Sequence, residues 1–211
     1  MDRADVFVFY DVVQYDKNGW RNRNRIKTAQ GLQWLSVPVL QKNRNDQKIC
    51  DVEIDNRRNW ARKHISSLQQ AYARAPYTAM YITELSQLLE RSWTHLSDLD
   101  FQLTMKICQW LDLPVQVYRC SELDVGGGRN ERLLNICQHF GAERYISGDS
   151  AKGYLDVESF EQSGIAVEWQ EYSHPQYRQL HADFSAQLSV VDLIFNHGDE
   201  ALSKIRQGRP E

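Results

Sequence analysis

Four cations alternate with amide side chains in one short segment near the amino end, residues 20–28. Arginine guanidinium groups bind phosphate oxygens in bidentate fashion, and asparagine amides bind hydroxyl oxygens. A nucleotide-linked sugar carries both kinds of oxygen, so we favour an anion site over the alternative, a solvated charged loop. Trp20 adds an aromatic face for stacking a base or a sugar. The candidate binding residues here are Gln14, Tyr15, Trp20, Arg21, Asn22, Arg23, Asn24, Arg25 and Lys27.

A second candidate site is the small, hydroxyl-bearing segment Ser147-Gly148-Asp149-Ser150, which Lys152 follows. After a strand, such residues present backbone N–H groups to a phosphate, and the next helix adds the partial positive charge of its N-terminus. Lys152 would neutralise further negative charge. The alternative is an ordinary helix start that Asp149 or Ser150 caps. Both interpretations remain open.

A third candidate is Arg129, which follows a turn of three glycines at residues 126–128. The turn has neither the Walker spacing nor the GxGxxG spacing, so it predicts a flexible connection more than a phosphate loop. Arg129 is a candidate substrate-binding residue. Its alternative role is to pair with Glu131 or to cap the helix.

Proton transfer would need a base, because an amine must lose its ammonium proton before it is acylated. Imidazole titrates nearest neutral pH, so His174 is the first candidate, with Tyr177 beside it as a binding residue. Asp11, at the carboxyl end of an expected strand, is the alternative base. Lone histidines are more often structural. The sequence contains no HExxH or HxxxH metal spacing and no GxSxG nucleophile, so no metal is expected and no cofactor is assigned.

Composition limits the classes of protein that the chain can form. Its 211 residues, 42% of them hydrophobic, are enough for one core, so we expect a single domain over residues 1–211. The sequence contains no apolar run as long as a membrane span, which argues against a transmembrane helix. Charged residues at its amino end argue against a secretory signal. The cysteines are scattered, which is typical of small buried side chains. We therefore expect a cytoplasmic protein, and the oligomeric state is left unassigned.

The charge is distributed unevenly along the chain. Residues 12–48 contain eight basic and two acidic side chains, whereas the whole chain has a net charge of −3. A local positive field on an acidic protein favours a specific phosphate-bearing small molecule over nucleic acid.

The elements that would position these residues follow from periodicity. Short apolar or alternating runs predict strands at residues 6–10, 34–39, 50–55, 115–118, 145–146 and 165–169. Helical spacing predicts an inserted helical segment at about residues 56–112, and another helix at residues 129–140. Residues 14–33 lack apolar periodicity and predict a long loop, although the alternating cations also fit an edge strand with all four cations on one face. The order of elements after residue 115 predicts an α/β fold, three-layer-like, with a mostly parallel sheet.

Many segments in the right order resemble the WbqC-like protein family, and the match spans nearly the whole chain. The segments that carry the resemblance are residues 5–9 (DVFVF) with Asp11, Gln14 and Tyr15; 20–28 (WRNRNRIKT); 34–39 (WLSVPV); Ile54, Asp55, Asn56 and Trp60; 75–77 (APY); Arg129 with 131–134 (ERLL); 145–148 (YISG) with Lys152 and 154–156 (YLD); His174, Pro175 and Tyr177; and Leu188, Ser189, Asp192, Leu193, Phe195 and Asn196.

The resemblance implies a role in O-antigen or related surface-polysaccharide assembly, and transfer of glycine or a similar acyl group to an amino sugar has been suggested for the family. Family members usually begin with an additional strand and a loop, so either the start of this sequence was assigned late or the sequence lacks that element. Our leading hypothesis is a transferase that acts on a nucleotide-activated amino sugar. The alternatives are a non-catalytic binding or scaffold protein of the same pathway and a nucleotidyltransferase-like enzyme.

Overall fold

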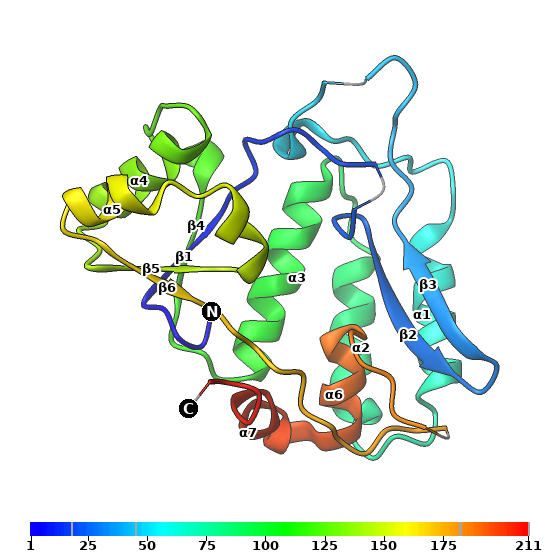
Figure 1. The fold of residues 1–211 in the computed structure, drawn as a ribbon. Coiled ribbons are helices and arrows are strands. Elements are labelled where there is room, and N and C mark those ends of the chain that lie inside the picture. Colours follow the sequence, from blue (N-terminus) through cyan, green and yellow to red (C-terminus); the bar gives the residue numbers. More distant parts are fainter. Residues whose placement is uncertain (18, 45, 182, 211) are drawn as a thin grey trace. The chain divides into compact units, whose positions relative to one another are not determined.

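The computed structural model describes residues 1–17, 19–44, 46–181 and 183–210 (Figure 1). These residues form six strands and seven α-helices, with short 3-10 helices between them. The chain divides into two compact units. Unit 1 consists of Met1–Tyr10, Pro114–Ser173 and Gln207–Glu211, and unit 2 of Asp11–Leu113 and His174–Arg206. The α/β class is confirmed, and the single domain stays a prediction.

Unit 1 contains two pairs of parallel strands. Strand β1 (Val6–Phe9) pairs with β4 (Gln116–Arg119), and β5 (Arg144–Ser147) pairs with β6 (Ala166–Trp169). The predicted parallel pairing is therefore confirmed, although the described strands pair two by two and do not form one continuous sheet. All four strands are only four residues long, so few backbone hydrogen bonds hold each pair.

Two helices complete the alternation of strand and helix in unit 1. Helix α4 (Arg129–His139) follows the glycine turn, and α5 (Val157–Gln162) precedes β6. Phe160 of α5 is fully buried and stacks on Tyr145 of β5, with ring centroids 5.1 Å apart. The core of this unit is small, so polar contacts contribute to its stability as well. Its buried members are Cys137, Ala151, Leu155, Phe160 and Ile165.

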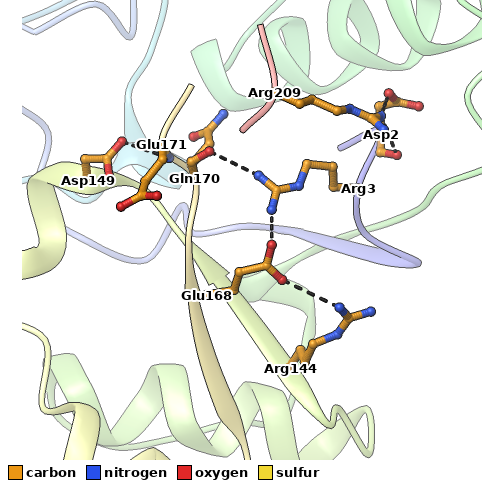
Figure 2. A network of polar contacts seen from close by, with 8 residues as sticks. All are labelled: Asp2, Arg3, Arg144, Asp149, Glu168, Gln170, Glu171 and Arg209. Atoms are coloured by element: carbon orange, nitrogen blue, oxygen red, sulfur yellow. Dashed lines mark hydrogen bonds and ion pairs between the residues drawn. The ribbon is translucent and has the colours of Figure 1, made fainter. Parts of the chain in front are cut away.

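Ion pairs tie both ends of the chain to unit 1. Arg3 pairs with Glu168 of β6 and donates to the carbonyl oxygen of Gln170 at 3.1 Å, as Figure 2 shows. At the other end, Arg209 pairs with the carboxylate of Asp2. Glu168 also lies 3.6 Å from Arg144 of β5, so one carboxylate joins the amino end to both strands of the β5–β6 pair.

Unit 2 contains an antiparallel hairpin where a long loop was expected. Strand β2 (Arg23–Thr28) pairs with β3 (Gly31–Ser36), and Thr28 faces Gly31 across the turn. Gly31 has a φ of +110°, which favours glycine because a side chain would be strained there. The prediction of a loop is wrong for the residues of β2 and β3, and the alternative, a strand, is confirmed for β2. Arg21 lies before that strand, so only three of the four cations belong to it.

The inserted helical segment is confirmed as three helices, α1 (Trp60–Ala71), α2 (Thr78–Leu89) and α3 (Leu96–Trp110). Helix α2 contacts α1, α3 and a later helix, α6 (Val190–His197), which α7 (Ala201–Arg206) follows. Their apolar faces form the main core. Its fully buried members include Leu96, Leu99, Ile194 and Phe195. None of the helices in the described part of the chain is both long and apolar enough to cross a bilayer.

The strand predicted over residues 50–55 is also wrong. Ile49–Asp51 forms a 3-10 helix, and beyond it only Glu53 and Ile54 make single bridges, to His95 and Val39. The alternation of apolar and acidic residues arises because Val52 and Ile54 point into the core from an irregular segment. Period-two alternation therefore identified the buried face here but not the type of element.

A buried carboxyl group connects α6 to the hairpin. Asp192 is fully buried, and it accepts hydrogen bonds from the hydroxyl groups of Tyr72 at 2.8 Å and Tyr177 at 2.9 Å. The Tyr72 hydroxyl in turn accepts the backbone N–H of Lys27 in β2 at 3.3 Å. Burial raises the pKa of Asp192, while the two tyrosine hydrogen bonds and the charge of Lys27 oppose that shift. We call these residues, with Tyr72 at the end of α1, the Asp192 network.

We predict that Tyr72→Phe lowers the free energy of unfolding by about 1–3 kcal/mol, because it leaves one oxygen of a buried carboxyl without its donor. Urea denaturation followed by far-UV circular dichroism measures the change. Tyr154→Phe is the matched control, since Tyr154 is 44% exposed and its loss of one hydroxyl should change stability by less than about 0.5 kcal/mol. Equal effects of the two variants would contradict the role given to the Asp192 network.

Candidate functional site

Two arginines of β2 lie against two tryptophans. The guanidinium carbon of Arg23 lies 4.7 Å from the ring centroid of Trp34, and that of Arg25 lies 5.0 Å from Trp20 and 5.5 Å from Trp34. The indole rings are 4.8 Å apart and both are more than 40% exposed. We call these four residues the Arg–Trp cluster. Each stacking contact contributes about 0.5–1 kcal/mol at an exposed site and orients the guanidinium group before any ligand arrives.

The hairpin register explains the cluster. Arg25 directly faces Trp34 across the two strands, and Arg23, two residues earlier, projects from the same face of β2. Trp20 lies in the turn before β2, where the carbonyl oxygen of Gly19 accepts Nε of Arg23 at 3.1 Å. The expected binding residues Trp20, Arg23 and Arg25 are therefore brought together.

An open depression of about 360 Å³ adjoins the cluster and is lined by Trp20, Asn24, Gln187 and Leu188. Nη2 of Arg25 donates to the backbone oxygen of Gln187 at 3.2 Å and to its side-chain oxygen at 3.4 Å. The N–H of Ser189 donates to the carbonyl oxygen of Arg25 at 2.8 Å, which holds this segment against β2. Sequence reasoning included Trp20 and Asn24 but missed Gln187 and Leu188.

Trp34 was also missed, because it lies in the short run at residues 34–39 that predicted only a strand. It is 43% exposed and stacks with arginines. Strand alternation predicts which residues share a face of β3 with Trp34. Only the hairpin pairing, which places Arg25 directly opposite Trp34, shows that this face is polar.

Lys27 does not belong to the exposed row of cations. It is buried, and its Nζ donates to Oε1 of Gln179 at 3.1 Å, to the carbonyl oxygen of His181 at 3.0 Å, and to that of Asp183. An ammonium group has three N–H donors, so these oxygens occupy all of them. These hydrogen bonds give Lys27 a structural role, and its binding of phosphate stays a prediction.

Asn22 is likewise engaged with the backbone. Its amide Nδ2 donates to the carbonyl oxygen of Val37 at 2.8 Å, and Val37 N–H donates to Asn22 O at the same distance. These reciprocal bonds fix the open end of the hairpin, and they give Asn22 a structural role. Gln14 is exposed, and its amide lies 3.5 Å from the carboxylate of Asp46.

A partly buried carboxyl group lies near Arg21 and Tyr15. Loss of hydration raises the pKa of Asp100, in α3, to about 7, and the positive charge of Arg21 opposes this shift. Burial, then the charge of Asp100, raises the pKa of Tyr15. A carboxyl group that titrates near neutrality is suited to proton exchange. Sequence reasoning missed Asp100, whose only signal is an acid between the apolar positions Leu99 and Leu103.

The two bases expected from the sequence, Asp11 and His174, lie in different surroundings. Asp11 is buried, and its carbonyl oxygen accepts the N–H of Cys50 at 2.9 Å. His174 is exposed and contacts the rings of Tyr177 and Phe184, with centroids 6.3 and 5.8 Å away. Tyr177 directs its hydroxyl to Asp192, which gives it a structural role, and its binding role stays a prediction.

The remaining candidate residues belong to unit 1. Ser147 is buried, whereas Gly148 and Ser150 are exposed. Lys152 pairs with Asp149 at 3.0 Å and with Glu171 at 3.1 Å, so two carboxylates already compensate its charge. Figure 2 shows Asp149 accepting the backbone N–H of Glu171, at 3.1 Å. Asp149 therefore joins the end of β6 instead of capping a helix.

Arg129, the other candidate of unit 1, stacks on Tyr154 with its guanidinium carbon 3.7 Å from the ring centroid. Its carbonyl oxygen accepts the Tyr10 hydroxyl at 3.3 Å. Glu131 accepts the N–H of Gly128 at 3.0 Å, so the acid caps α4 and does not pair with Arg129. The described residues contain no group of three histidine, cysteine, aspartate or glutamate side chains arranged to hold a metal ion.

Residues 1–204 match the model of the WbqC-like protein family. A relative, "Uncharacterized protein Rv1507c" of Mycobacterium tuberculosis, is 40% identical over 208 residues, which cover 98% of this chain and 90% of that protein. No solved structure matches the chain. The family match and the relative both extend over nearly the whole chain, and the chain belongs to the WbqC-like protein family.

Proposed function

We propose that the protein is a transferase of surface-polysaccharide biosynthesis, of the O-antigen type, that acts on a nucleotide-activated amino sugar. The Arg–Trp cluster would bind the phosphates of that substrate. The observation that carries the proposal is the pair Arg23 and Arg25, whose guanidinium groups are stacked in place beside an open depression. Membership of the WbqC-like family supports the pathway.

Stacking suits these arginines to phosphate binding. The faces of the guanidinium groups lie against indole rings, which orients the N–H groups along their edges, and guanidinium N–H groups bind anionic oxygens in a bidentate manner. Because the side chains are already ordered, less conformational entropy is lost when the ligand binds. The proposal rests on unit 2 alone.

Asp100 is the proton acceptor that we propose for the acyl-transfer step, in place of Asp11 or His174. An amino sugar attacks an acyl carbon only after its ammonium group has lost a proton. A carboxyl group with a pKa of about 7 is present partly as carboxylate at neutral pH and can accept that proton. Arg21, whose charge acts on Asp100, would steer the anionic substrate towards it.

A non-catalytic binding protein of the same pathway is the second candidate. The exposure of Trp20 and Trp34 favours it, since half-exposed aromatic rings next to cations also mark surfaces that recognise a partner. Incubation of the protein with nucleotide-activated amino sugars and acyl donors separates the two. Mass spectrometry of the nucleotide-sugars detects turnover, and cells with and without the gene give the same comparison in vivo.

We predict that Arg23→Ala combined with Arg25→Ala abolishes the thermal stabilisation that nucleotide-sugars give to the wild type. Ligand at about one hundred times its Kd should raise the Tm of a chain of this size by roughly 5–10 °C. Differential scanning fluorimetry with a panel of uridine, guanosine and thymidine diphosphate sugars measures the shift.

The matched control is Arg74→Ala combined with Arg91→Ala. Both residues belong to unit 2 and are exposed, so the control removes the same charge from the same unit. It should retain the full shift. Absence of a shift in the wild type with every nucleotide-sugar, or an undiminished shift in the Arg23 and Arg25 variant, would remove the basis of the proposed function.

We predict that Asp100→Asn changes how stability depends on pH. The pKa of Asp100 is raised from 3.8 to about 7, so the native carboxyl keeps its proton to higher pH than the unfolded one. Its stabilising contribution is complete below about pH 4 and is lost as the pH rises to about 7, by at most ~1.4 kcal/mol per pH unit. Asparagine cannot titrate, so the variant should become more stable relative to wild type over this range.

Urea denaturation of both proteins between about pH 4 and pH 8 measures this difference. Taking the difference between the two proteins cancels the contributions of the other titrating groups. Parallel stability curves for the two proteins across this range would exclude Asp100 as a group that exchanges a proton near neutrality.

A further inference from the structure

We infer that the depression lined by Trp20, Asn24, Gln187 and Leu188 is a subsite for one sugar ring, and that Asn24 and Gln187 determine which sugar it accepts. This inference rests on the proposed function, because it assigns the sugar of a nucleotide-sugar to the depression and its phosphates to the Arg–Trp cluster.

The lining has the chemistry of a sugar site. Trp20 offers an apolar aromatic face on which the C–H groups of a pyranose ring can pack, and Leu188 adds aliphatic surface. The amide NH2 groups of Asn24 and Gln187 provide donors for the oxygens of a sugar, while their side-chain oxygens accept from Arg25. None of the four lining residues is charged, so the depression itself suits a sugar ring and not a phosphate.

The size and place of the depression agree with this division. Its volume of about 360 Å³ is at the small end of the ~300–1,000 Å³ of ligand pockets, which suits one ring more than a whole nucleotide. Arg25 bonds Gln187 and stacks on Trp20, so a phosphate bound by Arg25 would be the immediate neighbour of a ring in the depression. Nε of Arg25 is buried and makes no hydrogen bond with the described residues.

The backbone at Gln187 is a second, independent observation. Gln187 has a φ of +57°, in the left-handed region where glycine is favoured and a long side chain is strained. Such strain is tolerated where the side chain is used for function. Asn24 is also held in a defined position, because its Oδ1 accepts the N–H of Arg25 at 2.8 Å, and its NH2 group then serves as the donor.

The test measures the contribution of the sugar and not total affinity. Isothermal titration calorimetry compares each diphosphate sugar with its parent diphosphate, for example UDP-N-acetylglucosamine with UDP. In the wild type, at least one sugar should bind more tightly than its parent nucleotide. In Gln187→Gly and in Asn24→Ala, this ratio should fall by about two- to tenfold, the effect of one lost hydrogen bond. The ratio is the readout because both side chains also contact Arg25, so each variant is compared through its own affinity for the parent nucleotide.

Gln187→Gly is informative because it retains the backbone oxygen that Arg25 contacts and relieves the positive φ. The chain should therefore fold at least as stably as the wild type. The matched control is Asn43→Gly, at an exposed position of unit 2 with a φ of +61°. It makes the same type of backbone change away from the depression and should leave the sugar contribution unaltered.

The possible failures are distinguishable. Equal affinities for every sugar and its parent nucleotide in the wild type, or an unchanged ratio in both variants, would overturn the sugar subsite and leave the phosphate site standing. Absence of binding by every nucleotide and every nucleotide-sugar would overturn both the subsite and the proposed function.

Discussion

The position of the candidate site depends on one buried carboxyl group. Asp192 can be fully buried because two tyrosine hydroxyls satisfy it, and the Tyr72 hydroxyl also accepts a backbone N–H of β2. The same helix begins beside Ser189, whose N–H bonds the carbonyl oxygen of Arg25. Helix α6 and β2 are thus joined at two points. The Arg–Trp cluster, which is built on β2, inherits its position from these polar contacts and not from apolar packing alone.

Apolar periodicity predicted the elements that apolar packing creates. The helices α1 to α4 and the parallel strands of unit 1 were recognisable because their buried faces recur at helical or strand spacing. Strand β2 was not, since Ile26 is its one apolar residue and hydrogen bonds to β3 define it. Residues 50–55 failed in the opposite way, because an irregular segment can bury alternate residues without pairing along its length. The pattern of a single sequence indicates which residues are buried, but it does not identify which strands pair with each other.

The candidate site was predictable in part for the same reason. The alternation in residues 20–28 correctly placed Arg23 and Arg25 on one face, but the same rule wrongly exposed Lys27, which oxygens of Gln179, His181 and Asp183 cover. Those oxygens lie more than 150 residues away in sequence, so no local pattern could predict their hydrogen bonds with Lys27. Gln187 was missed because its unusual φ is not visible in the sequence. Asp100 was missed because its raised pKa comes from loss of hydration in the folded chain, which the sequence does not show either.

The pairing of β1 with β4 has a consequence for biosynthesis. Val6 pairs with Gln116, and the larger segment of unit 2, Asp11–Leu113, lies between them in the sequence. During synthesis, the apolar segment Val-Phe-Val-Phe of β1 therefore leaves the ribosome before its partner strand β4 exists. It stays unpaired until more than half of the protein has been made. An unpaired strand of this composition readily joins other chains. Chaperones that hold apolar segments would matter most during this interval.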